Sequence, residues 1–423
     1  MNTQSDNSFT VFVGIDWADT KHDICIQAAD SDKREFDCIQ HKTDEIEQWA
    51  YAMHKRFGGP IAIAVELSKG PIVYALQKYD FLVIFPVHPS TLAKYRQAFS
   101  PSGAKDDPTD AEFILDLLLH HPDRFKPLCP QSVEMRTLMT LVEQRRTLVN
   151  DRVRITNRLR DALKQYYPQT LEWFPRGIDT VMFCDFIARW PTLKQGKRAR
   201  ENTLIKFFHE HSMRFPGVLE RRLKAIKAAQ PLTLDEAVIR PYSLQSLVLV
   251  DQLRVTLQAI ERYASEIDEV ADQHEDLFVF QSFPGAGPTY APRLLVAFGE
   301  QRDRYANAAE AQKSAGIAPV VERSGKKVWI HWRYQCSKFL RQTFVEWAAQ
   351  TINKSYWAGE YYRQQRDKGC KHQVAVRALA FKWIRILFRC WQTRTPYDEL
   401  VYLQALKRRG SPLLRPMDAP AKG

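Results

Sequence analysis

Residues 9–16 read FTVFVGID, an apolar run of strand length that ends in an acid, and residues 61–66 read IAIAVE, a second run of the same kind. Between them, residues 23–29 and 34–39 read as two further strands joined by short polar turns. A fifth apolar run covers residues 81–87, after a stretch with helical spacing. Three strands in succession, followed by strand, helix and strand, predict a mixed α/β sheet.

This order of elements is typical of the RNase H-like fold, and we expect such a domain over residues 9–130. A doubly wound nucleotide-binding domain would alternate strand and helix from its beginning. No Gly-x-Gly-x-x-Gly follows the first strand, and the chain contains no Gly-Lys-Ser/Thr phosphate loop. The sequence therefore gives no support to dinucleotide or P-loop chemistry.

Beyond the first domain, apolar side chains recur at steps of three and four residues, which predicts long helices. Two such segments, residues 131–167 and 244–272, predict an antiparallel coiled-coil arm or an oligomerisation element. Residues 168–243 contain several prolines and predict a helical insertion, to which the sequence assigns no chemistry. We expect a mostly α-helical C-terminal domain over residues 273–398 and a basic tail over residues 399–423.

Composition and the N-terminus indicate where the protein acts. The longest apolar runs are far shorter than a membrane span, and residues 1–9 do not have the pattern of a signal peptide. The seven cysteines form no Cys-x-x-Cys pair, which favours reduced thiols over disulfides or a zinc site. We therefore expect a cytoplasmic protein without a membrane partner.

The positive charge is concentrated where aromatic side chains are also frequent. The chain has 423 residues with a net charge of +12, and residues 321–391 hold 15 Lys and Arg, 4 acids and 14 aromatic residues. Cations neutralise phosphates and aromatic rings stack on bases, so this block is a candidate for DNA and RNA contact. The alternative is a helical core with a solvated basic face. Residues 136–164, with eight basic side chains, are a second candidate. The residues that we expect to contact nucleic acid are Arg323, Lys326, Lys327, Arg333, Lys338, Arg341, Arg145 and Arg152.

Four carboxylates occupy positions that suit a metal site. Asp16 and Glu66 end strands that are neighbours in an RNase H-like sheet, and Asp107 and Asp110 lie at the head of a predicted helix over residues 110–119. Clustered carboxylates repel one another unless a divalent cation such as Mg²⁺ lies among them. Alternatively, Asp107 caps the helix and Asp110 complements its dipole. Three further acids are expected at the surface, namely Asp19, Asp23 and Asp106.

A glycine-rich turn opens the C-terminal domain. Residues 284–288 read PGAGP, and Gly285 and Gly287 can expose backbone N–H groups to a phosphate. A plain corner between two helices is an equally good interpretation of this turn.

Two separated sets of motifs resemble one known family. They are Gly14-Ile15-Asp16, Val65-Glu66 and Lys105–Ala111 in the first part of the chain, and Pro284–Pro288, Gly316–Pro319, Arg323–Gly325 and Lys338–Arg341 in the last part. In this combination and order, the chain resembles the DEDD transposases of the insertion sequence 110 family. The glycine usual in the last motif is absent, and residues 168–240 exceed what the family usually carries.

The resemblance implies a RuvC-like domain with a coiled coil, followed by a transposase domain that contains a nucleophilic serine. By this comparison Asp16, Glu66, Asp107 and Asp110 would hold Mg²⁺ or Mn²⁺, and Ser324 would attack the DNA phosphate. It also implies double-stranded donor and target DNA and a structured, element-encoded guide RNA as partners, in a bacterial, nucleoid-associated protein. Members assemble as dimers that join into a tetramer, with acids from one subunit and the serine from another.

The residues around Ser324 agree with this role. A serine hydroxyl is a poor nucleophile without assistance, and Arg323, Lys326 and Lys327 flank it with positive charge. Gly325 gives the backbone freedom to bring the hydroxyl close to a DNA strand. Two other candidates have ordinary structural explanations: Ser314 as a helix end, and His331 as a packed side chain beside tryptophans.

Three functions are thus open at this point. The first is a recombinase that uses both the acids and the serine. The second is a metal-dependent RuvC-like nuclease or junction resolvase that needs only the acids and a basic surface. The third is a nucleic-acid-binding protein whose acids are structural. The two-part arrangement of the motifs favours the recombinase.

Overall fold

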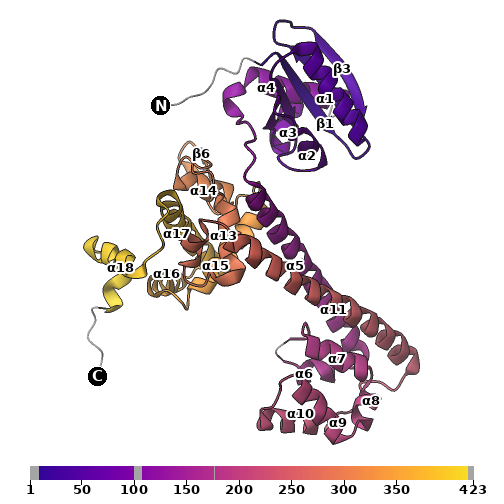
Figure 1. Ribbon diagram of the computed structural model, residues 1–423. Coiled ribbons are helices and arrows are strands. Elements are labelled where there is room, and N and C mark those ends of the chain that lie inside the picture. Colours follow the sequence, from indigo (N-terminus) through magenta and orange to yellow (C-terminus); the bar gives the residue numbers. More distant parts are fainter. Residues whose placement is uncertain (1–8, 100–106, 176, 418–423) are drawn as a thin grey trace. The chain divides into compact units, whose positions relative to one another are not determined.

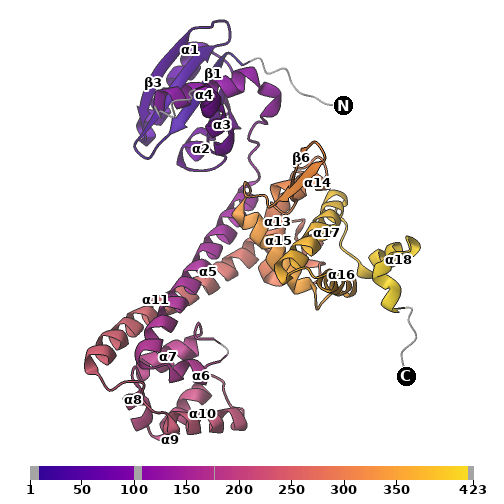
Figure 2. The ribbon, with the colours of Figure 1, turned by 180° about the vertical axis from the view of Figure 1, so that it is seen from behind.

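The computed structural model describes residues 9–99, 107–175 and 177–417. The chain forms two compact units, one ending at Pro130 and the other beginning at Gln131. We call them the sheet unit and the helical unit and describe each by itself (Figures 1 and 2).

The sheet unit is built on a mixed sheet whose described strands have the order β3-β2-β1-β4-β5. β1, β2 and β3 pair antiparallel, whereas β4 and β5 run parallel to β1. This topology confirms the RNase H-like fold predicted from the order of the elements. The strands are β1 (Val11–Trp17), β2 (Lys21–Ala28), β3 (Arg34–Gln40), β4 (Ile61–Val65) and β5 (Leu82–Pro86).

Helices cover both faces of this sheet. α1 and α2 pack on one face, over a core that includes Val11, Val13 and Ile15. α4 packs on the other face so closely that a Cβ on Gly14 would lie 2.2 Å from the carbonyl oxygen of Ala111. The glycine is therefore required for α4 to lie directly on β1. The helices of the unit are α1 (Thr43–Phe57), α2 (Pro71–Leu76), α3 (Pro89–Phe99), α4 (Asp107–His120) and η1 (Pro122–Arg124).

The helical unit begins with a long antiparallel helix pair, α5 (Val133–Tyr166) and α11 (Glu236–Asp272) (Figures 1 and 2). Tyr263 donates a hydrogen bond to Gln144 along this pair, at 2.7 Å. α11 begins earlier than the sequence analysis expected, because the side chain of Asp235 accepts a hydrogen bond from the backbone N–H of Ala237 and caps the helix. Neither these nor the other described helices are both long and apolar enough to cross a membrane.

The residues between α5 and α11 form a small helical subdomain with an aromatic core. Phe183, Phe186 and Phe208 are fully buried there, together with Leu163 of α5 and Leu253 of α11. The subdomain thus closes the apolar seam at one end of the helix pair. Its helices are α6 (Gln169–Trp173), α7 (Val181–Arg189), α8 (Leu193–Arg198), α9 (Glu201–Glu210) and α10 (Pro216–Ala228).

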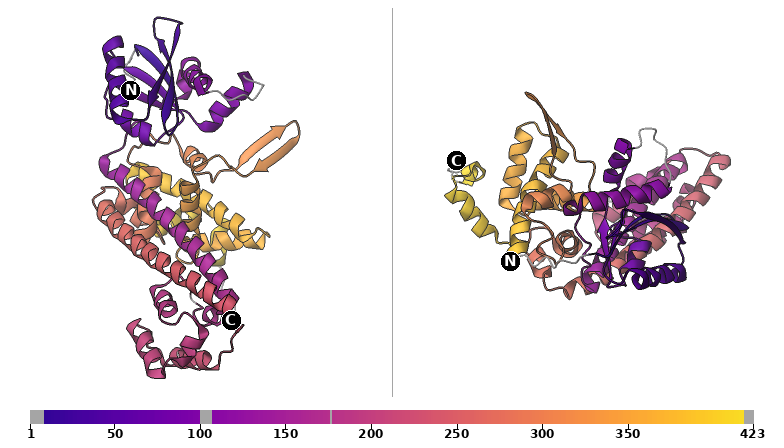
Figure 3. Two further views of the ribbon diagram at one scale, coloured as in Figure 1. Left: turned by 90° about the vertical axis from the view of Figure 1, so that its right-hand side faces the viewer. Right: turned by 90° about the horizontal axis from the view of Figure 1, so that it is seen from above.

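The rest of the helical unit surrounds a tryptophan-rich core. Trp347, Trp357, Trp383 and Trp391 are all fully buried. The hairpin of β6 and β7 stands away from these helices (Figure 3). The elements are α12 (Leu277–Gln281), α13 (Gly287–Phe298), α14 (Ala308–Ser314), β6 (Val320–Ser324), β7 (Lys327–His331), α15 (Lys338–Thr351), α16 (Tyr356–Asp367), α17 (His372–Thr393), α18 (Glu399–Arg408) and η2 (Pro412–Met417).

Candidate active site

Asp16 and Glu66 lie next to each other at the carboxyl ends of two neighbouring strands, β1 and β4. β1 and β4 are parallel and in register, with Ile15 beside Val65, so the residues that follow each of them are neighbours. Asp16 alternates with Ile15 and therefore shares the face of Gly14, which α4 covers. Both acids are half-buried. The strand pairing therefore brings together two of the four acids that the sequence analysis singled out.

The first turn of α4 lies toward the same strand ends. Arg34 on β3 is level with Phe12 on β1, because both lie opposite Gln27 on β2. Arg34 binds Glu112 at 2.6 Å and also Asp116 on α4. Gly14, two residues further along β1, lies under Ala111 at the beginning of α4. α4 therefore runs opposite to β1, and its beginning approaches the end of β1 that carries Asp16. Asp107 is the first residue of α4, but its side chain lies outside the described residues.

Asp110 is almost completely buried and forms a bidentate ion pair. Its side chain is 2% exposed, and both carboxylate oxygens accept hydrogen bonds at 2.6 Å from Nε and Nη2 of Arg96 on α3. A buried carboxylate is costly unless a cation balances it. In this structure the guanidinium of Arg96 supplies that charge.

The structure corrects our expectation for Asp23. It lies directly opposite Asp16 on β2, is 7% exposed, and pairs with Lys21 at 3.0 Å. Opposed residues of antiparallel strands point to the same face, so Asp23 is a buried neighbour of Asp16 and not a surface residue. Asp19 is exposed, as expected, and Asp106 lies outside the described residues.

The donor set suits a divalent cation in its chemistry. Asp16, Glu66 and Asp110 offer only carboxylate oxygens, the ligands that Mg²⁺ and Mn²⁺ favour. They lie on the α4 face of the sheet. On this face the buried Asp110 is already balanced by a cationic group, the guanidinium of Arg96. Among the described residues, no group of three or more acids, histidines or cysteines is close enough together to hold a metal ion.

Ser324 lies at the tip of the β6–β7 hairpin, which the sequence analysis did not predict as strands. Ser324 pairs with Lys327 across a two-residue turn whose first residue, Gly325, has φ of +56°. A positive φ at this position is typical of tight hairpin turns and favours glycine. From Val321 to His331 the described residues are exposed. The serine is thus presented to solvent.

The strand register separates the cations around Ser324. Lys327 lies directly opposite Ser324 and therefore shares its face, whereas Arg323 lies opposite Val328 on the other face. Lys326 occupies the turn, and Lys338 is exposed at the start of α15. Lys327 is therefore the cation best placed beside the serine hydroxyl.

Three other arginines hold the base of the hairpin. Arg333 donates to the carbonyl of Ala318 at 3.2 Å, and Arg341 donates to the carbonyl of Arg333 at 3.3 Å. Arg377, which the sequence analysis did not single out, donates to the carbonyls of Gly316 and Ile317 at 2.9 and 3.2 Å. Arg333 and Arg341 therefore have a structural role, whatever contact they also make with nucleic acid.

The two competing candidates from the C-terminal block have ordinary surroundings. Ser314 is the last residue of α14. His331 is not packed between tryptophans: its side chain is 47% exposed and its Nε2 lies 3.2 Å from Glu322 on the paired strand. A cross-strand contact on an exposed hairpin accounts for His331 without a catalytic role.

The glycine turn at residues 284–288 is a packed helix corner. Gly285 has φ of +72°, and a Cβ there would lie 3.1 Å from that of Gln350 on α15. Trp347 also donates to the carbonyl of Pro284 at 3.2 Å. Gly287 lines a cavity of about 300 Å³ together with Asp268 and Asp272, whose charges would repel a phosphate. These contacts favour the corner over the phosphate-binding interpretation.

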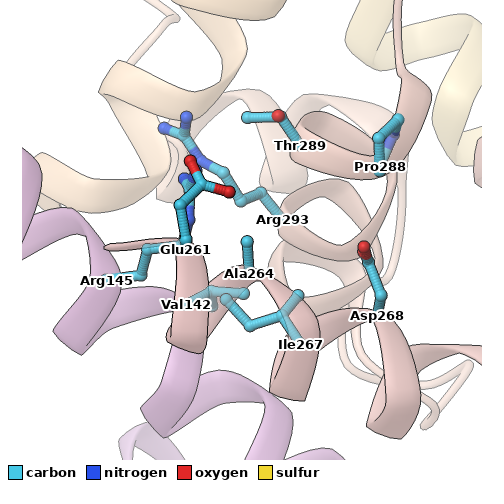
Figure 4. Close-up of a pocket in the computed structure, with 9 residues that line it drawn as sticks. All are labelled: Val142, Arg145, Glu261, Ala264, Ile267, Asp268, Pro288, Thr289 and Arg293. Carbon is cyan, nitrogen blue, oxygen red and sulfur yellow. The ribbon is translucent and has the colours of Figure 1, made fainter. Parts of the chain in front are cut away.

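Arg145 points into the interior of the helical unit. It lines a cavity of about 320 Å³ between α5, α11 and α13, together with Glu261, Asp268 and Arg293 (Figure 4). Burial lowers the pKa of Arg145. Arg152 lies 3.6 Å from Asp179 in the insertion. The exposed cations of this helix are others, namely Arg136, Arg154, Arg158 and Lys164.

Comparison with known proteins identifies the family. A model of the DEDD transposases of the IS110 type matches residues 13–168, and the model of the transposase IS116/IS110/IS902 family matches residues 278–363. The first match spans the sheet unit and α5, and the second spans the segment from α12 to α16 that carries the serine hairpin.

Full-length relatives agree with these matches. A Streptomyces coelicolor mini-circle protein assigned as the transposase for IS117 is 28% identical over 404 residues, covering 93% of this chain and 97% of the relative. The 44.8 kDa protein of insertion element IS116 from Streptomyces clavuligerus is 26% identical, over 70% of this chain and 73% of the relative. The two matched domains and the RNase H-like sheet together place this chain in the IS110/IS116 family of transposases, which are DNA phosphoryl-transfer enzymes.

Proposed function

We propose that this protein cuts and rejoins DNA for an insertion sequence, using an acidic metal site in the sheet unit and a serine nucleophile in the helical unit. The observation that carries the proposal is the position of Asp16 and Glu66 directly after the paired residues Ile15 and Val65, in a chain that also presents Ser324 on an exposed hairpin. A nuclease would need only the first of these features.

Asp16, Glu66, Asp107 and Asp110 would hold Mg²⁺ or Mn²⁺. A cation bound there neutralises charge on the DNA phosphate and favours loss of the proton from the attacking hydroxyl. Asp110 is bound by Arg96, so its carboxylate becomes a ligand only when this ion pair loosens. While the ion pair is intact, Arg96 would keep the acid in place and compensate its charge.

Ser324 would attack the phosphorus of the DNA backbone through Oγ. The new P–Oγ bond replaces the bond to one deoxyribose oxygen, which leaves as a hydroxyl, and the serine proton passes to a base. Lys327, on the same face of the hairpin, would balance negative charge on the phosphate as the bond forms. The phosphoserine ester conserves the energy of the phosphodiester, so the reverse attack by a second DNA end rejoins the strand.

The partners proposed for this reaction are double-stranded donor and target DNA and a structured guide RNA encoded by the element. The net charge of +12 and the exposed cations of the hairpin support a polyanionic partner. We further propose that dimers join into a tetramer, so that acids of one subunit serve the serine of another.

The test is to incubate the protein with Mg²⁺, the noncoding RNA that flanks its gene and a labelled DNA target, and to look for a covalent protein–DNA adduct on a denaturing gel. We expect an adduct that is lost in Ser324→Ala and in Asp16→Ala but retained in the matched control Ser314→Ala. DNA cleavage without an adduct, retained in Ser324→Ala, would instead identify a metal-dependent nuclease.

A further inference from the structure

A groove lies beneath the serine hairpin, between β7 and helices α16 and α17. Its volume is about 450 Å³, and its walls include Ile330 and Trp332 from the hairpin, Tyr361 from α16, and Val374 and Phe381 from α17. Sites for small ring systems commonly have about 300–1,000 Å³. Ile330 is 71% exposed and Val374 51% exposed, so this apolar surface is open to solvent.

Cations flank the apolar floor of the groove on α17. Helical periodicity places Lys371, Val374, Phe381, Lys382 and Arg385 on one face of this helix. Lys371, the N-cap residue of the helix, and Arg385, within the helix, are both exposed. The ammonium group of Lys382 lies 4.4 Å from the ring centre of Tyr361. No described residue that lines the groove is acidic. An apolar, aromatic floor between cations complements a base between its phosphates.

The indole of Trp332 is held in place. The guanidinium of Arg377 lies 3.3 Å from the centre of its ring and is itself fixed by the carbonyls of Gly316 and Ile317. Trp332 is nevertheless 42% exposed. A fixed, exposed ring needs little further ordering when another ring stacks on it.

We propose that this groove binds unpaired nucleotides of the DNA strand that Ser324 attacks, with a base among Trp332, Tyr361 and Phe381 and its phosphates near Lys371, Lys382 and Arg385. The proposal rests on the proposed role of Ser324. Lys327 faces Ser324, and His331, which also lines the groove, lies four residues further along β7 on the same face, about 13 Å away.

The groove requires an unpaired base because a base within a duplex already has both ring faces stacked. A free base exposes those faces, and stacking on a protein aromatic ring stabilises it in a way that tolerates any sequence. The DNA strand, in preference to RNA, is assigned because one strand, β7, contributes to both the groove and the face of the serine.

The test measures binding of a short fluorescent single-stranded DNA to the full-length protein by anisotropy. We expect Val374→Glu and, from the opposite wall, Ile330→Glu to weaken binding about tenfold or more. Val248→Glu on α11 is the matched control, because Val248 is 50% exposed on a helix outside the groove, and its affinity should equal that of the wild type. A 5-iodouracil in the same strand should photo-crosslink to peptides that contain Trp332, Tyr361 or Phe381.

Wild-type affinity in both groove variants, or crosslinks elsewhere only, would overturn the proposal. Preferential binding and crosslinking of RNA of the same sequence would overturn the assignment to DNA. Ser324→Ala separates this test from that of the proposed function, because it should bind the strand normally while forming no adduct. Adduct formation by the wild type together with unaltered binding by Val374→Glu would refute the groove alone.

Discussion

At the scale of single residues, Arg96 is the side chain on which the state of Asp110 depends. Replacing it by alanine leaves a buried carboxylate without its cation, which we expect to destabilise the sheet unit by about 3 kcal/mol. Because a bound divalent cation would compensate the same charge, Mg²⁺ should stabilise Arg96→Ala more than the wild type. Urea unfolding with and without Mg²⁺ measures both effects.

The control for this variant is Arg56→Ala, which breaks the exposed pair with Glu35. That loss should be small and independent of Mg²⁺, because water screens exposed charges. An equal Mg²⁺ response in both variants would mean that Asp110 is not a metal ligand.

His22 should make the sheet unit sensitive to acid. It is fully buried, and its Nε2 lies 2.9 Å from Nδ1 of His41. Burial, followed by the nearby His41, lowers the pKa of His22 from 6.5 to about 4. The unfolded chain therefore takes up a proton at a higher pH than the folded one. Stability is full above pH 6.5 and falls as the pH drops toward 4, by up to about 3 kcal/mol.

His22→Gln should flatten this dependence, because glutamine can keep a polar contact with His41 without titrating. The measurement is the urea midpoint of the sheet unit between pH 4 and 7 for both proteins. Parallel pH profiles for the two would show that another group is responsible.

At the scale of elements, the contact of α4 with β1 sets the position of the acids. Gly14→Ala would place a methyl group against the backbone of Ala111 and Leu115 and push α4 outward. We expect a cost of about 1–3 kcal/mol and a loss of adduct formation in the assay described above. The control is Gly58→Ala. Its φ of +57° strains an alanine by about 1 kcal/mol, but the space around it is open, so this variant should retain adduct formation.

The hairpin carries two cations close to Ser324 in sequence, Arg323 directly before it and Lys327 directly after the turn. Lys327→Ala should slow adduct formation by roughly tenfold or more, because the lysine shares the face of Ser324. Arg323→Ala should have a clearly smaller effect on the rate, because its side chain projects from the opposite face. The rates come from single-turnover time courses, and equal losses would contradict the assignment of faces.

The elements also show what the sequence could and could not predict. The sheet was predictable because its central strands are short, largely apolar runs separated by polar turns. Asp23 was misjudged because its proximity to Asp16 depends on the register between β1 and β2, which spacing along the chain does not give. The β6–β7 hairpin was missed although both strands contain β-branched residues, because neither strand has the apolar alternation of a core strand. The inward direction of Arg145 depends on contact with α13, far away in sequence.

At the scale of the whole molecule, two units with separate cores should unfold as two transitions. Gly14→Ala should lower the melting temperature of the sheet unit only. Trp383→Ala, which removes a fully buried ring, should destabilise the helical unit only, by about 3–5 kcal/mol. Calorimetry of the full-length variants tests this, and a single transition that shifts with both substitutions would show that the units are coupled.

The antiparallel course of α5 and α11 has a consequence for how such proteins diverge. The chain leaves α5 at Tyr166 and re-enters α11 at Glu236, and both points lie at the same end of the helix pair. A gene can therefore gain or lose the subdomain between them as one cassette, while the paired helices keep their contacts and the coding sequence on both sides keeps its reading frame. Differences in length among relatives should therefore accumulate in the subdomain between α5 and α11, where insertions and deletions leave the paired helices intact.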